Sequence, residues 1–176
     1  MGFLLLSGGA YPPAGAQKAP VAPSYAVTLT AYNAVPEQTD SDPHITASGA
    51  RSNPEVVAAR SRDLAADLPF GTIIEVDGTN ASKESCGYDI VAPIIGYRVI
   101  ADTMNARYTD RIDLLFDTEA DYTLAGGRVR NAGIVLGICE GVTVSVVGYV
   151  DIRRIPKTQV ELAALVEGTG GSLALK

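Results

Sequence analysis

The sequence predicts a mainly β protein, a small closed barrel of about six strands with long loops and one or two short helices. Short runs of Val, Ile, Thr and Tyr alternate with other residues, as in strands with one buried face, whereas helical periodicity is scarce. Closure is expected because strands this apolar would leave aggregation-prone edges in an open sheet. The 176 residues suffice for one such domain with its own core.

The expected elements begin near residue 25 and follow one another along the chain. Strands are predicted by alternation or by short buried runs over residues 27–32, 56–59, 73–76, 97–102, 112–116 and 142–150. Helical turns are expected over residues 64–68, 118–122 and 157–166. Residues 36–53 form a long polar loop that we expect to line a site, and residues 79–93 read as a polar insertion.

Three regions are therefore expected: a Pro/Ala-rich lead-in over residues 1–24, the barrel over 25–152, and a tail with a short helix over 153–176. The lead-in starts with an apolar run, Phe3 to Leu6, which is too short to span a bilayer. It resembles the remnant of a signal peptide, so we expect a secreted or cell-envelope protein, monomeric and without a membrane span.

Charge and cysteine content restrict the partners. The net charge of −6 argues against nucleic acid and anionic membranes and suits a carbohydrate better. One His and two separated Cys do not make a zinc site, so neither a metal nor another cofactor is expected. Cys86 and Cys139 either form a disulfide or are two buried apolar residues.

Two aspartates stand out within a predicted strand–loop–strand segment. Asp102 ends one strand and Asp113 lies in the next, eleven positions later. If both carboxylates share a cleft, one of them can stay protonated near neutral pH. The alternative is a pair of solvated acids that only brace the loop.

Several separated segments resemble, in order, one family: the 3D domain, named for three aspartates. The matching segments are residues 27–32 (VTLTAY), 45–49 (ITASG), 57–59 (VAA), 62–64 (RDL), 68–72 (LPFGT), 101–103 (ADT), 111–116 (RIDLLF) and 119–120 (EA). The match spans roughly residues 25–152. It departs from the family most between Met104 and Asp110, where members usually carry two glycines, so this loop is expected to decide what is bound.

The resemblance implies a double-psi β-barrel related to the MltA-type lytic transglycosylases and to expansins. It places the three aspartates at Asp63, Asp102 and Asp113, with Asp113 as catalytic acid. Asp102 is the second catalytic candidate, as the neighbouring carboxylate that would stabilise an oxocarbenium-like transition state. The candidate substrate-binding residues are Asp63, Thr30, Tyr32, Thr46 and Tyr108. For two of these the residues leave alternatives open: Asp63 could cap a helical turn or orient the loop backbone, and Tyr108 could cover the barrel mouth instead of stacking on a sugar.

The implied activity is cleavage of bacterial peptidoglycan glycan strands by lytic transglycosylation. One carboxyl group then serves as acid and base, its pKa raised by partial burial beside a second carboxylate. Arg107 and Arg111 could oppose this by pairing with either aspartate. One rival interpretation is an expansin-like module that binds cell-wall glycan without cutting it. Another is a structural barrel in a larger surface or phage assembly.

Overall fold

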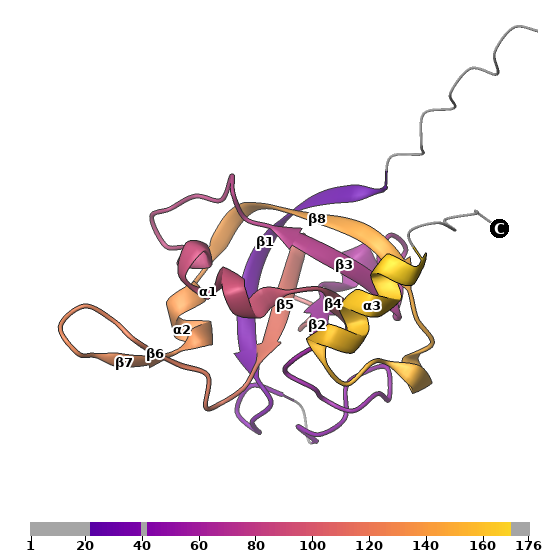
Figure 1. The fold of residues 1–176 in the computed structure, drawn as a ribbon, viewed down its shortest axis with the longest axis horizontal. Helices are drawn as coiled ribbons and strands as arrows, with labels where there is room; N and C mark the ends of the chain where they lie inside the picture. The colour runs from indigo at the N-terminus through magenta and orange to yellow at the C-terminus, as the bar shows by residue number, and fades with distance from the viewer. Residues whose placement is uncertain (1–21, 40–41, 170–176) are drawn as a thin grey trace, which may run out of the picture.

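Six strands close into a barrel in the computed structural model, which describes residues 22–39 and 42–169 (Figure 1). The expected closed barrel is thus confirmed, while most of the lead-in lies outside the described residues. Around the barrel the strand order is β1-β5-β2-β4-β3-β8. The strands are β1 (Ser24–Asn33), β2 (Val57–Arg60), β3 (Thr72–Asp77), β4 (Arg98–Thr103), β5 (Arg111–Phe116) and β8 (Cys139–Tyr149).

Neighbouring strands of the barrel are mostly distant in sequence. β1 pairs with β5 in parallel, and β2 pairs with β4 in parallel, whereas the remaining pairs are antiparallel. Parallel neighbours cannot be joined by a tight hairpin, which explains the long connections in this chain. Residues from opposite halves of the sequence therefore lie side by side.

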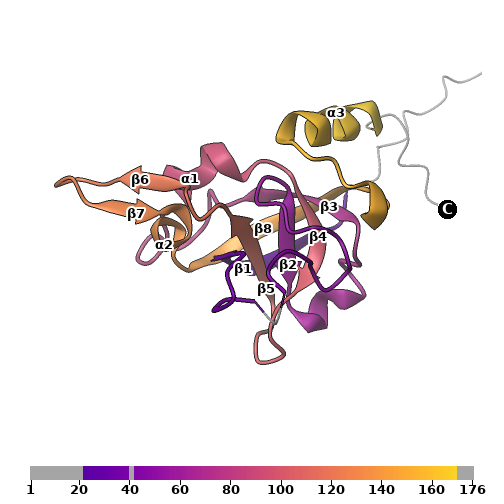
Figure 2. The ribbon, with the colours of Figure 1, turned by 90° about the horizontal axis from the view of Figure 1, so that it is seen from below.

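The strands bury side chains on both faces. One cluster includes Leu29, Ile100 and Leu114, which alternate with residues of a second cluster on the other face of the same strands. The second cluster is completed by α3 (Gln159–Thr169), whose Leu162 is fully buried, and α3 lies across one side of the barrel (Figure 2). Burial on both faces explains why the strands are so apolar.

In the described part of the chain, three short α-helices and two 3-10 turns accompany the barrel. Besides α3 they are α1 (Tyr88–Ile95), α2 (Ala132–Leu136), η1 (Arg62–Ala65) and η2 (Ile152–Arg154). The expected polar insertion over residues 79–93 is thus helical from Tyr88 onward. Val91 and Ile95, four positions apart in this helix, are both buried and form its apolar face. No helix of the described residues is long and apolar enough to cross a membrane.

Residues 118–122 do not form the expected helix. Instead β6 (Asp121–Thr123) pairs with β7 (Val129–Asn131) in a hairpin that projects from the barrel (Figures 1 and 2). Gly126 and Gly127, with φ of 85° and 75°, supply the left-handed backbone that the turn requires. The turn geometry thus prevails over the weak helical tendency of the preceding residues.

A disulfide joins Cys86 to Cys139, so these residues are not merely buried apolar side chains. It connects residues 53 apart, from the segment before α1 to the start of β8. Cys139 is fully buried. The bond therefore fixes the α1 region to the barrel wall.

Arg98 is a buried cation at the start of β4. Its guanidinium donates hydrogen bonds to the backbone carbonyls of Ile94, Ile95, Pro54 and Leu115. Burial lowers its pKa to about 10. The side chain thus joins the C-terminal end of α1 and the segment before β2 to the barrel.

Candidate active site

Four residues form a row across four adjacent strands. Thr30 on β1 is the register partner of Asp113 on β5, and Asp113 is in turn the partner of Ala59 on β2. Ala59 also partners Asp102 on β4, where the register shifts. Residues in such a row project from the same face of the sheet. The two aspartates therefore flank the small side chain of Ala59, their Cα atoms about 10 Å apart at two strand spacings.

Asp113 is half-buried and has the perturbed pKa expected of an acid catalyst. Burial is the largest cause and raises the pKa of its carboxyl group to about 6. Thr30 Oγ1 donates a 2.7 Å hydrogen bond to Asp113 Oδ1, and this bond together with the charge of Arg111 limits the rise. The negative charge of Asp102 adds only a smaller increase. Desolvation, more than the neighbouring carboxylate, thus raises the pKa of Asp113.

Asp102 accepts three hydrogen bonds from fixed donors. The backbone N–H groups of Thr103 and Ala47 donate to Oδ1 at 2.8 and 2.9 Å, and Tyr32 OH donates to Oδ2 at 2.9 Å. All three groups are donors, so each bond uses a lone pair of the Asp102 carboxyl oxygens. Asp102 is therefore held in place and has little capacity left for further partners.

Tyr32 connects β1 to Asp102 across the row. Its side chain is 9% exposed, and burial followed by the charge of Asp102 raises its pKa well above 10. The hydroxyl therefore stays protonated and donates. Since β1 and β4 are separated by β5 and β2 in the barrel order, this bond joins two strands that are not neighbours.

Thr46 shapes the loop above Asp102 and does not face the carboxylates with its hydroxyl. It is 5% exposed, donates to the carbonyl of Ala50 at 3.1 Å, and lies 3.0 Å from Ser48 Oγ. The backbone N–H of Ser48 donates to the carbonyl of Ala101 at 3.2 Å. This turn presents the N–H of Ala47 to Asp102, so the long loop does line the candidate site.

Asp63 lies apart from the row and holds the loop between β4 and β5. Its Oδ2 accepts the backbone N–H of Asp110 at 2.9 Å, and this bond is the largest cause that lowers the pKa of the exposed Asp63 carboxyl group. Asp110 has a left-handed φ of 51°, so the bond supports an uncommon backbone conformation. The N-cap of the 3-10 turn is Ser61 and not Asp63. Of the alternatives for Asp63, the structure shows the orienting of loop backbone.

Tyr108 is half-buried beside two arginines. The guanidinium carbons of Arg107 and Arg111 lie 4.7 and 5.0 Å from the centroid of its ring. In the described part of the chain neither arginine forms an ion pair with an aspartate. The expected lowering of the Asp113 pKa by these arginines is thus limited to the longer-range charge of Arg111.

No family model matches this chain, and no curated protein matches it significantly in sequence. The resemblance to the 3D domain therefore remains a hypothesis based on the residues themselves. Its three aspartates occupy two environments: Asp102 and Asp113 share one face of the barrel, while Asp63 braces the neighbouring loop.

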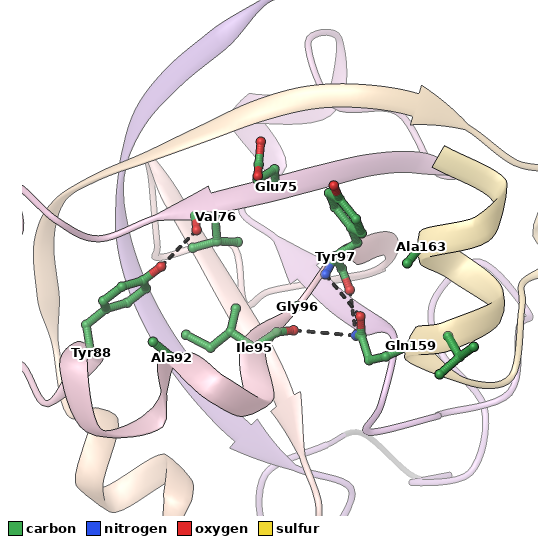
Figure 3. Close-up of a pocket in the computed structure, with 10 residues that line it drawn as sticks. Glu75, Val76, Tyr88, Ala92, Ile95, Gly96, Tyr97, Gln159 and Ala163 are labelled. Carbon is green, nitrogen blue, oxygen red and sulfur yellow. Dashed lines mark hydrogen bonds between the residues drawn. The ribbon is translucent and has the colours of Figure 1, made fainter. Parts of the chain in front are cut away.

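A groove of about 470 Å³ lies elsewhere, between α1 and α3 (Figure 3). Gln159 crosses its base, where its side chain bonds to Tyr97 and Ile95, and Tyr88 OH donates to the carbonyl of Val76 at 2.8 Å (Figure 3). The polar groups of Gln159 and Tyr88 thus hold elements together. Within the described residues no three His, Cys, Asp or Glu side chains gather as a metal site would require.

Ala59 and the N–H of Ala47 are the contributors that the sequence did not reveal. An alanine in a buried strand and a backbone amide in a loop carry no chemical signal of their own. The role of Ala59 follows from the strand order, which brings β2 between the two aspartates, whereas Ala47 reaches Asp102 from the loop before β2.

Proposed function

We propose that this protein cleaves the glycan strand of peptidoglycan as a lytic transglycosylase, with Asp113 as its single general acid and base. The observation that carries the proposal is the half-buried Asp113, whose pKa is raised to about 6 and whose Oδ1 is positioned by Thr30. A carboxyl group with this pKa can donate a proton near neutral pH and accept one afterwards.

The engagement of Asp102 favours a single-carboxylate mechanism. Retaining and inverting glycosidases need a second carboxylate that is free to attack the sugar or to activate water. Asp102 instead accepts hydrogen bonds from Tyr32, Ala47 and Thr103. It is better placed to stabilise positive charge that develops on the sugar ring.

The proposed reaction has two proton transfers and consumes no water. Asp113 gives its proton to the glycosidic oxygen as the bond from that oxygen to C1 breaks. The resulting carboxylate then takes the proton of the same sugar's 6-hydroxyl, whose oxygen attacks C1 and closes a 1,6-anhydro ring. Asp113 is thereby protonated again, and its Thr30 hydrogen bond supports the intervening carboxylate.

The proposal extends to location. A disulfide is most common in proteins of oxidising compartments, and Cys86–Cys139 fits a secreted or cell-envelope protein that meets peptidoglycan there.

The deciding experiment incubates purified sacculi with wild type and with Asp113→Asn, and analyses the soluble products by mass spectrometry. Wild type should release products that end in 1,6-anhydromuramic acid, and the variant should be about 10²–10⁴-fold slower because general acid catalysis contributes that much. Asp121→Asn, on the projecting hairpin β6–β7, is the matched control and should act as wild type does. Equal release by Asp113→Asn and wild type would refute the assignment. Binding of sacculi without any soluble product would favour the expansin-like module.

A further inference from the structure

Two arginine side chains meet at one tyrosine ring beside the candidate site. The guanidinium carbons of Arg107 and Arg111 lie 4.7 and 5.0 Å from the centroid of Tyr108, so they are within about 10 Å of each other. Arg107 Nη2 also donates a 2.7 Å hydrogen bond to the hydroxyl of Tyr108. The ring attracts both cations, but they repel one another.

No carboxylate of the described residues neutralises this pair through an ion pair. Asp110 precedes Arg111 in the loop, and its backbone N–H engages the carboxylate of Asp63, which lies on η1. The whole chain nevertheless carries a net charge of −6. Two adjacent unpaired cations in an acidic protein create a local positive field that attracts an anion.

The cations lie close to the proposed proton donor. Arg111 and Asp113 are two positions apart on β5 and project from the same face, which separates their Cα atoms by about 7 Å. The positive charge of Arg111 already acts on Asp113, whose pKa it lowers. An anion bound at Arg111 would therefore belong to a group near the bond that Asp113 protonates.

We propose that Arg107 and Arg111 form a subsite for a carboxylate carried by the glycan, next to the cleaved bond. This inference rests on the proposed function and names the substrate class as a strand with acidic sugars, such as muramic acid with a free lactyl group. Guanidinium groups bind carboxylates through paired N–H donors. Tyr108 then positions the arginines, since their guanidinium groups lie over its ring.

The test compares two monosaccharides that differ in the lactyl carboxylate. N-acetylmuramic acid and N-acetylglucosamine are titrated separately into ¹⁵N-labelled wild type, and NMR follows the arginine Nε–H signals and the backbone of residues 107–113. The acidic sugar should bind at least about tenfold more tightly, a difference that added salt should reduce. It should also raise the pKa of Asp113, because it offsets the charge of Arg111.

Side-chain variants locate the effect. Arg107→Gln and Arg111→Gln should each weaken binding of N-acetylmuramic acid about three- to tenfold, and the double variant should bind both sugars equally. Arg111→Lys keeps the charge without the planar donors and should restore only part of the affinity. Arg130→Gln, an exposed arginine on β7, is the matched control. Amide spectra outside the loop verify folding.

Equal affinity of wild type for both sugars, or an undiminished preference in the double variant, would overturn the carboxylate subsite. Neither sugar has a glycosidic bond to break, so this result is independent of catalysis. Preference for the acidic sugar together with intact sacculi would refute the proposed function and leave the subsite standing.

Discussion

Replacement of Asp113 by Asn should make the protein more stable above pH 6, in proportion to the cost of ionising a half-buried carboxyl group. The pKa of Asp113 is about 6 in the folded protein against an ordinary value of 3.8. Between these values the native state retains a proton that the unfolded state releases. Stability therefore falls as pH rises from about 4 to about 6.

The size of this effect follows from the same two values. Their difference corresponds to about 3 kcal/mol at 1.36 kcal/mol for each pKa unit. This amount is lost once Asp113 is fully ionised, and Asn does not ionise. The isosteric amide can still accept the hydrogen bond from Thr30 through its oxygen. Asp113→Asn should thus exceed wild type by up to about 3 kcal/mol at pH 8.

Urea unfolding at pH 4, 5, 6, 7 and 8 measures the difference between the two proteins. Other carboxyl groups titrate in both, so they cancel in the difference. The gap should widen from pH 4 to pH 6 and then level off. A gap that is constant with pH, or one that narrows as pH rises, would contradict a raised pKa for Asp113. Asp121→Asn should show no such widening.

Two further substitutions test how the site and the barrel are held. Tyr32→Phe removes the donor to Asp102 Oδ2. The free energy of unfolding, measured in urea at pH 7, should fall by about 1–3 kcal/mol, and glycan cleavage should be slower. Unchanged stability would mean that water replaces the hydroxyl. Replacing Cys86 and Cys139 together by Ala opens a 53-residue loop and should cost up to about 4 kcal/mol from unfolded-chain entropy, measured in the same way. A loss near zero would show that the rest of the fold already restrains that segment.

The strands and the barrel class could be predicted from the sequence because alternation is a local signal. β4, β5 and β8 lie close to where it placed them. α1 could not be predicted because Pro93 lies inside it and a polar segment precedes it, so the spacing of Val91 and Ile95 does not stand out. Hairpin β6–β7 was missed because a pair of glycines defines its turn and its strands are only three residues long.

The candidate site was predictable only in part. The Asp102/Asp113 spacing drew attention to the two acids, but their separation by Ala59 depends on strand order, which no local pattern contains. From the sequence, the raised pKa of Asp113 was expected to come from partial burial beside a second carboxylate. In the structure, burial contributes more to this pKa than the charge of Asp102 does. The engagement of Asp102 by Tyr32 and by the N–H of Ala47 could be found only from coordinates.

The row of residues around Ala59 has a consequence for how the protein acquires its chemistry during folding. The bonds from Thr30 to Asp113, from Tyr32 to Asp102 and from Ala47 to Asp102 join residues 83, 70 and 55 positions apart. Contacts of such long range form only after large loops have closed, and they slow folding. No fragment of one half of the chain contains the site. Glycan cleavage would therefore report completed folding of the whole barrel.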